Sequence, residues 1–217
     1  MASFYDRVIL PLLIDRACGL GPIRWLRRGV IPDAEGRVLE IGIGSGHNFR
    51  YYDPGRVSAV VGVDPAGDMT TKARDRAEAA GLAVDLRTLS AETLPLDTGD
   101  VDTVVCTFSL CTIPDAAAAL GEMRRVLKPG GRLLFAEHGR SPDARVRRWQ
   151  DRLDRPWGWI AGGCHLNRPI DALIREAGFG FDRLDTGYMR KTPPTHGFYY
   201  AGTARKAPSV TSGGPRP

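Results

Sequence analysis

The chain has 217 residues, which fits one domain with a substantial buried core. Hydrophobic residues make up 42% of it and charged residues 25%, as in an ordinary soluble globular protein. The net charge of +5 comes from scattered arginines without an aromatic–basic motif, so we expect no nucleic-acid partner. No apolar run is long enough to span a bilayer, and we expect neither a spanning segment nor a cleaved signal peptide.

The cysteines indicate a reduced, cytoplasmic protein. The chain contains Cys18, Cys106, Cys111 and Cys164, and no two of them form a C-x-x-C pair. Their spacing is not typical of a metal site either, so the sequence predicts no bound metal.

The apolar spacing within residues 3–30 predicts two short amphipathic helices, and Gly19 and Gly21-Pro22 interrupt the pattern between them. We interpret them as a lid over a substrate. A helical cap packed on the domain and a helix lying on a membrane surface are the alternatives. The remaining chain to residue 206 completes one domain, and the Pro, Gly and Ser composition of residues 207–217 predicts a disordered tail.

After the N-terminal helices, strands alternate with helices. The predicted strands are residues 37–41, 58–63, 83–89, 101–108, 132–137, 181–188 and 197–204, and residues 101–108 are nearly all apolar and β-branched. The first predicted helix opens at residues 47–49 and is ended quickly by residues 51–55. The others span residues 65–80, 115–127, 142–160 and 169–178, and Pro156 is expected to break the helix over 142–160. This alternation predicts an α/β fold with a doubly wound, mostly parallel, seven-stranded, Rossmann-like sheet. The last two strands form a hairpin, which makes one of them antiparallel.

The most informative stretch is residues 38–47, with the sequence VLEIGIGSGH. An apolar strand ends in an acid, and three alternating glycines follow. Such a turn lets backbone N–H groups approach a ligand closely. The spacing G-x-G-x-G differs from the dinucleotide pattern G-x-G-x-x-G, which disfavours a nicotinamide oxidoreductase.

The next strand, Val60 to Val63, also ends in an acid, Asp64. An acid at this position can accept both ribose hydroxyls of a nucleoside. Together, the two strand ends resemble the cofactor site of class I S-adenosylmethionine (SAM) dependent methyltransferases, and the resemblance extends from about Arg37 to Lys206.

The resemblance implies SAM as the cofactor. By this resemblance, the glycine turn lies along the methionine part of SAM, and Glu40 either orients the turn or meets the ammonium group through water. Asp64 binds the ribose hydroxyls, and the loop after the third strand contacts the adenine. The residues that it assigns to the cofactor are Glu40, Gly42, Gly44, Gly46, Asp64, Pro65, Met69, Ser90, Ala91, Glu92, Thr107 and Phe108.

A set of motifs resembles a narrower group, the methyltransferase-like proteins that S-methylate small alkyl thiols. The segments that carry this resemblance are Asn48-Phe49, Pro54-Gly55, Cys106 to Cys111, Phe135 to His138, Trp149-Gln150, Asp154 to Trp157 and Gly163 to Leu166. They imply a small, fairly apolar methyl acceptor, with a thiol favoured. Quinone and phospholipid methyltransferases of the same broad family, and a SAM-binding regulatory protein without turnover, are the alternatives.

Two histidines are candidates for activating the acceptor. His138 follows the fifth strand at the carboxyl end of the sheet, where ligands bind in such folds. His165 follows Gly162-Gly163-Cys164 and is the second candidate, whereas Cys164 itself is expected to be a small buried residue. A thiol needs only to be deprotonated, so a weak base or a nearby cation suffices.

Overall fold

The computed structural model describes residues 5, 9–66 and 70–207, without the side chains of residues 70 and 71. Met69 and nearly all of the tail predicted to be disordered lie outside the described residues. The N-terminal helices are described from residue 10 onward.

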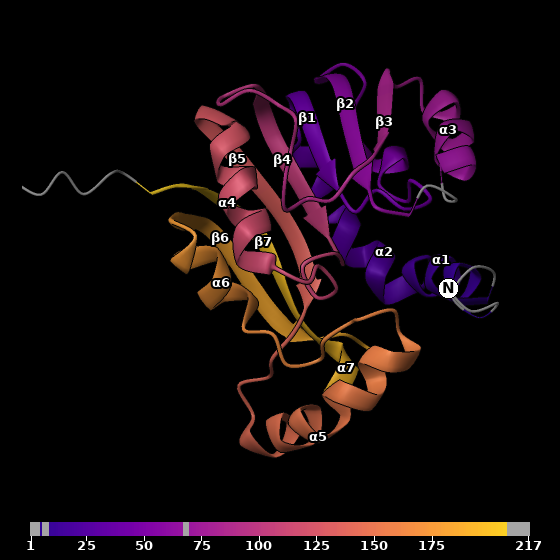
Figure 1. Ribbon diagram of the computed structural model, residues 1–217, viewed down its shortest axis with the longest axis vertical. Coiled ribbons are helices and arrows are strands. Elements are labelled where there is room, and N and C mark those ends of the chain that lie inside the picture. Colours follow the sequence, from indigo (N-terminus) through magenta and orange to yellow (C-terminus); the bar gives the residue numbers. More distant parts are fainter. Residues whose placement is uncertain (1–4, 6–8, 67–69, 208–217) are drawn as a thin grey trace, which may run out of the picture.

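A seven-stranded sheet runs through the described chain in the order β3-β2-β1-β4-β5-β7-β6 (Figure 1). The strands are β1 (Gly36–Ile41), β2 (Val57–Asp64), β3 (Val84–Thr88), β4 (Val101–Thr107), β5 (Leu127–His138), β6 (Phe179–Tyr188) and β7 (Phe198–Lys206). The pairs from β3 to β5 are parallel, and β7 is antiparallel to both β5 and β6. The predicted doubly wound sheet with an antiparallel C-terminal strand is therefore confirmed.

Helices lie on both sides of this sheet. They are α1 (Leu10–Cys18), α2 (Gly21–Arg28), α3 (Thr70–Ala79), α4 (Ala116–Val126), α5 (Ala144–Ile160), α6 (Ile170–Glu176) and α7 (Pro194–Gly197). Short 3-10 turns, η2 (Ile31–Asp33) and η3 (Phe49–Tyr51), complete the regular structure. Figure 1 shows α5 and α7 close together beyond one end of the sheet.

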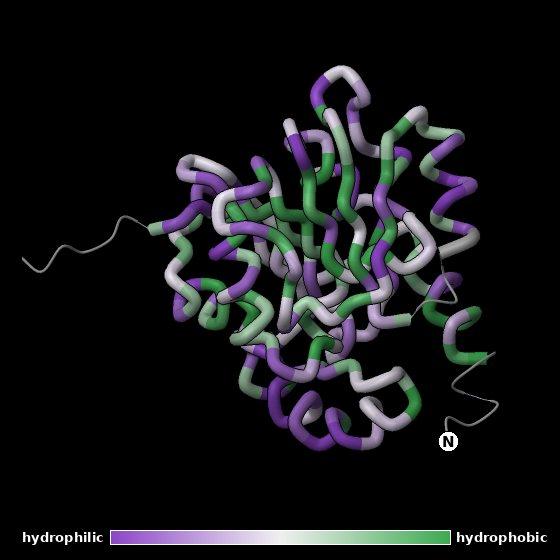
Figure 2. Tube along the Cα trace, turned by 45° about the horizontal axis from the view of Figure 1, so that its top comes forward, coloured by the Kyte–Doolittle hydropathy of each residue, from purple (hydrophilic) through white to green (hydrophobic). Residues whose placement is uncertain are grey.

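Two hydrophobic clusters sandwich the sheet. One contains residues of α4 and α6, such as Leu120 and Ile174, and the other contains residues of α2 and α3, such as Leu26 and Ala73. Apolar residues are correspondingly concentrated along the strands (Figure 2). β1 and β4, both largely buried, lie side by side in the middle of the sheet.

The strand order reverses between β1 and β4. The chain moves outward from β1 to β2 and β3, and then returns to the other side of β1 with β4. Ligands of open α/β sheets bind at the carboxyl ends of the strands next to such a reversal. This topology directs attention to residues 41–49, 64–66 and 107–111.

The short helix expected to open at residues 47–49 and to end within residues 51–55 is the 3-10 turn η3, because Tyr52 already has an extended backbone. Another local prediction is wrong. The expected break at Pro156 does not occur, and α5 runs through this residue to Ile160. A proline inside a helix removes one backbone hydrogen bond, and packing of Trp157 against His196 of α7, with ring centroids 4.4 Å apart, holds the last turn in place.

Candidate active site

The glycine turn after β1 has a backbone that only glycine accommodates. Gly42, Gly44 and Gly46 all have positive φ angles, of 65°, 49° and 78°. A Cβ atom on Gly42 would lie 2.0 Å from Ser109 Oγ, and one on Gly46 would lie 2.5 Å from the ring of Phe49. The turn therefore presents bare backbone at the end of the sheet, as close approach of a ligand requires.

Asp64 lies at the end of β2 directly beside this turn. Its Oδ2 accepts a hydrogen bond from the Gly44 N–H at 2.9 Å, and its Oδ1 accepts one from the Ala66 N–H at 2.8 Å. Burial raises the pKa of this carboxyl group, and the two backbone hydrogen bonds oppose that shift. Each carboxylate oxygen retains a second lone pair, so Asp64 can still accept from ribose hydroxyls.

Glu40 is buried beneath the turn, where it serves as a structural acceptor. Its Oε1 accepts from Asn48 Nδ2 at 2.9 Å, and its Oε2 accepts from the Tyr52 hydroxyl at 2.6 Å. Burial raises the pKa of Glu40 to about 7, although Tyr52, Arg27 and Asn48 favour the charged form. This arrangement agrees with the orienting role that the family resemblance implies.

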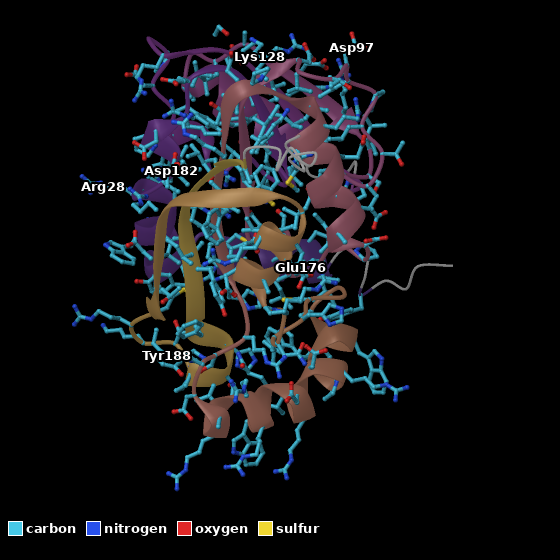
Figure 3. All side chains as sticks on the ribbon, turned by 90° about the vertical axis from the view of Figure 1, so that its left-hand side faces the viewer. Arg28, Asp97, Lys128, Glu176, Asp182 and Tyr188 are labelled. Atoms are coloured by element: carbon cyan, nitrogen blue, oxygen red, sulfur yellow. The ribbon has the colours of Figure 1, made fainter. Side chains whose placement is uncertain are left out.

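Arg27 is a central site residue that the sequence did not reveal. It reaches in from α2 with 5% of its surface exposed, and its Nη1 donates to Asn48 Oδ1 at 2.6 Å and to Thr107 Oγ1 at 2.5 Å. Its guanidinium also lies 5.5 Å from the centre of the Phe108 ring. The only sequence signal was an arginine on an amphipathic helix, and Arg24 and Arg28 give the same signal. Figure 3 shows Arg28 extending away from the molecule.

The loop after β3 lies next to Asp64, because the Leu89 N–H donates to the Asp64 carbonyl at 3.2 Å. In this loop Ser90 Oγ donates to Glu92 Oε2, and Glu92 Oε1 accepts from the Asp115 N–H. Both Glu92 oxygens are thus engaged with protein groups. Ala91 is buried, whereas Pro65 is exposed at the end of β2.

Phe108 directly follows β4 and has a backbone that phenylalanine rarely adopts, with a φ angle of 53°. The loop that follows is fixed by Glu137, whose Oε1 accepts from the N–H groups of Ser109 and Leu110 at 2.8 and 3.1 Å. The strained backbone turns Phe108 toward the carboxyl end of β5, where its ring lies 6.5 Å from that of His138. Strain maintained by buried contacts is typical of functional sites.

His138 ends β5 beside the Phe108 ring. Its Nε2 lies 3.1 Å from Cys164 Sγ. Its Nδ1 is buried and has no hydrogen-bond partner among the described residues. Cys164 is only half buried, and it contacts this histidine instead of packing as an isolated small residue.

His165 is less well placed than His138. Its Nδ1 pairs with Asp154 Oδ2 of α5 at 2.9 Å, and its side chain is 42% exposed. Its backbone N–H donates to the Cys111 carbonyl at 2.8 Å. The geometry therefore assigns His165 to fastening the segment after α5 and leaves His138 as the candidate at the acceptor position.

The N-terminal helix α1 is attached to the glycine turn through Asp15. This carboxylate accepts from Ser45 Oγ at 2.5 Å and from Lys72 at 3.1 Å, and it pairs with His47 Nε2 at 2.8 Å. Burial disfavours its charge, but these partners together with Arg76 lower the pKa of Asp15 below its ordinary value. That α1 and α2 act as a lid stays a prediction. In the described residues, no helix is both long and apolar enough to cross a membrane.

Comparison with known proteins agrees with this geometry. Residues 39–135 match the family described as a methyltransferase domain. Thiol S-methyltransferase TMT1B of Rattus norvegicus is 35% identical over 152 residues, which cover 68% of this chain and 62% of that protein. A phosphatidylethanolamine N-methyltransferase of Cereibacter sphaeroides is 34% identical (57% and 63% covered), and a demethylmenaquinone methyltransferase of Thermus thermophilus is 38% identical (58% and 59% covered). The matches thus span less than two thirds of these relatives.

The fold is shared with a SAM-dependent methyltransferase of Thermotoga maritima, at a TM-score of 0.65 and 22% identity over 92% of this chain and 99% of the other. The bare glycine turn and the carboxylate beside it fit the SAM cofactor that the sequence resemblance implied. The chain belongs to the class I SAM-dependent methyltransferases, whose cofactor is S-adenosylmethionine.

Proposed function

We propose that this chain transfers a methyl group from SAM to a small, fairly apolar thiol. The observation that carries the proposal is the meeting of two features at one edge of the sheet. The glycine turn with Asp64 forms the cofactor side, and Phe108 with His138 forms an adjoining apolar and polar wall. The thiol S-methyltransferase relative supports a sulfur acceptor.

The proposed site residues have two roles: some hold the cofactor, and others activate the acceptor thiol. Asp64 and the backbone of the glycine turn hold the cofactor, and the network of Glu40, Asn48 and Arg27 keeps that turn rigid. Bound SAM supplies a methyl group on a sulfonium sulfur, which a thiolate can displace in line. Phe108 excludes water from the acceptor side, and His138 is the polar side chain that favours the thiolate there.

The test is transfer of labelled methyl from SAM to a panel of acceptors that contains small alkyl thiols, a quinol and a phospholipid. Methylation of thiols alone is the expected result. Methylation of the quinol or the lipid alone would refute the thiol assignment. It would favour an acceptor like that of the demethylmenaquinone methyltransferase of Thermus thermophilus or the phosphatidylethanolamine N-methyltransferase of Cereibacter sphaeroides. Binding of S-adenosylhomocysteine without any product would favour the regulatory alternative.

Asp64→Asn tests the cofactor assignment separately. Loss of a charged acceptor for ribose hydroxyls should weaken S-adenosylhomocysteine binding roughly 10- to 100-fold, because such hydrogen bonds contribute about 1.5–3 kcal/mol. Asp85→Asn is the matched control, since Asp85 is exposed on β3 and pairs with Arg87. Equal affinities for the two variants in calorimetry would show that Asp64 does not hold the cofactor.

A further inference from the structure

Three side chains that can bind metal converge at the acceptor end of the site, although the sequence separates them widely. Cys111 lies in the loop after β4, His138 ends β5, and Cys164 follows α5. Their possible ligand atoms all lie within 4.8 Å of one another. We call these three residues the Cys2His cluster.

The surrounding backbone holds the Cys2His cluster in place. The loop that carries Cys111 is fixed from one side by Glu137 and from the other by Arg168, whose guanidinium donates to the carbonyl groups of Leu110 and Ile113. The same loop is joined to the segment after Cys164 by the His165 N–H, which donates to the Cys111 carbonyl at 2.8 Å. The cluster is therefore preformed, with Cys111 only 2% exposed.

Two features of the Cys2His cluster are unusual for ordinary packing. The Cys164 thiol contacts two other possible ligands at once, the Cys111 thiol and His138 Nε2, with its Sγ 3.1 Å from that nitrogen. The remaining ring nitrogen of His138, Nδ1, is buried and has no partner among the described residues. An unpartnered buried nitrogen carries a desolvation cost, which a bound ligand or water beside the ring would relieve.

We propose that Cys111, His138 and Cys164 bind a metal ion of the Zn²⁺ class and leave a fourth position open for the acceptor sulfur. Two thiolates and an imidazole are ligands that select such borderline ions over Mg²⁺ or Ca²⁺. Three protein ligands with an open fourth position are typical of catalytic zinc. The Phe108 ring lies 6.5 Å from the His138 ring, so the cluster adjoins the proposed acceptor site.

This inference rests on the proposed function and gives the thiol its activation. When the acceptor thiol binds the metal, its S–H bond breaks and the proton passes to water. The sulfur keeps the electron pair and uses it to form the new S–CH₃ bond. The C–S bond of the sulfonium breaks at the same time, and its electron pair stays on the sulfur of S-adenosylhomocysteine. His138 then acts as a metal ligand.

The test is titration of the metal-stripped full chain with Co²⁺, whose thiolate charge-transfer absorption reports sulfur ligation directly. One equivalent should bind with tetrahedral visible bands, and Zn²⁺ should displace it. Cys111→Ser and Cys164→Ser should each lose this absorption at stoichiometric Co²⁺. Cys18→Ser should keep it, since Cys18 lies on α1 outside the cluster. S-adenosylhomocysteine binding verifies that each variant is folded.

The metal site would be overturned if the folded native chain took up no stoichiometric Co²⁺. It would also be overturned if Cys111→Ser and Cys164→Ser took up as much Co²⁺ as the native chain. Thiol methylation that is unchanged after metal removal would overturn the role in activation. Metal uptake at the Cys2His cluster without methylation of any thiol would instead refute the proposed function and leave the metal site standing. Failure of the inference and failure of the proposed function are thus distinguishable.

Discussion

Glu40 shows how one buried carboxyl group links the site to stability. Its pKa rises from an ordinary value of 4.5 to about 7 because of burial, so the folded state binds the proton more tightly than the unfolded state. The contribution of Glu40 to stability is therefore full below pH 4.5 and is lost as the pH rises through 7. The difference between the two pKa values corresponds to about 3 kcal/mol.

Glu40→Gln should remove this pH dependence. The amide is neutral at every pH, and the Tyr52 hydroxyl can rotate to accept from it where it now donates. Between pH 5 and pH 8 the free energy of unfolding should fall by up to about 3 kcal/mol more in the native chain than in the variant. Denaturant unfolding at the two pH values measures the difference, with exposed Glu78→Gln as the control. Parallel pH profiles for native chain and Glu40 variant would contradict the prediction.

At the residue scale, the sequence identified groups whose role follows from their local position. Three alternating glycines predict a tight turn, and an acid at a strand end predicts a carboxylate beside it, because each feature depends on only a few neighbouring residues. Arg27 was missed because its partner Thr107 lies 80 positions away. The Cys2His cluster was missed for the same reason, since cysteine spacing along the chain says nothing about three segments joined only by the fold.

At the scale of elements, the sequence predicted which helices and strands exist better than where they end. The central parallel strands β1, β2 and β4 lie where apolar runs indicated, because burial on both faces of a parallel sheet demands such runs. The helix α5 was misjudged at Pro156 because local propensity alone ignores the packing of the turn that follows. Helix ends depend on such contacts, which a single sequence does not display.

The attachment of α1 is an element-scale property that can be tested by hydrogen exchange. Asp15→Ala removes the shared acceptor of Ser45, His47 and Lys72. Hydrogen bonds to a charged group contribute about 1.5–3 kcal/mol, and partial exposure reduces this. The amides of residues 10–18 should therefore exchange about tenfold faster in the variant. Arg16→Ala, an exposed site on the same helix, is the matched control, and equal protection in the two variants would contradict the attachment.

At the scale of the whole molecule, the two N-terminal helices differ in how they join the domain. No residue of α1 is buried, whereas α2 contributes Leu26 and Arg27 to the interior. Val30 and Ile31, which follow α2 directly, belong to the same hydrophobic cluster as the outer faces of β1 and β2. Helix α1 therefore lies on the periphery of the domain, whereas α2 is part of its core.

Two truncations should separate these roles. Removal of residues 1–19 deletes the partly buried Asp15 with its hydrogen bonds to Ser45, His47 and Lys72, but no buried residue of α1. Partly exposed bonds of this kind contribute about 1 kcal/mol each, so the melting temperature should fall by several degrees, on the order of 2–4 °C per kcal/mol. Removal of residues 1–30 deletes Leu26 and Val30, each contributing about 1.5–3 kcal/mol, and leaves Asn48 and Thr107 without the Arg27 donor. That loss approaches the total stability of a typical domain, about 5–15 kcal/mol, so cooperative thermal unfolding should disappear. Calorimetry of both truncations distinguishes the cases. An equally large loss on removing residues 1–19 would mean that α1 belongs to the core, and a cooperative transition without residues 1–30 would mean that α2 does not.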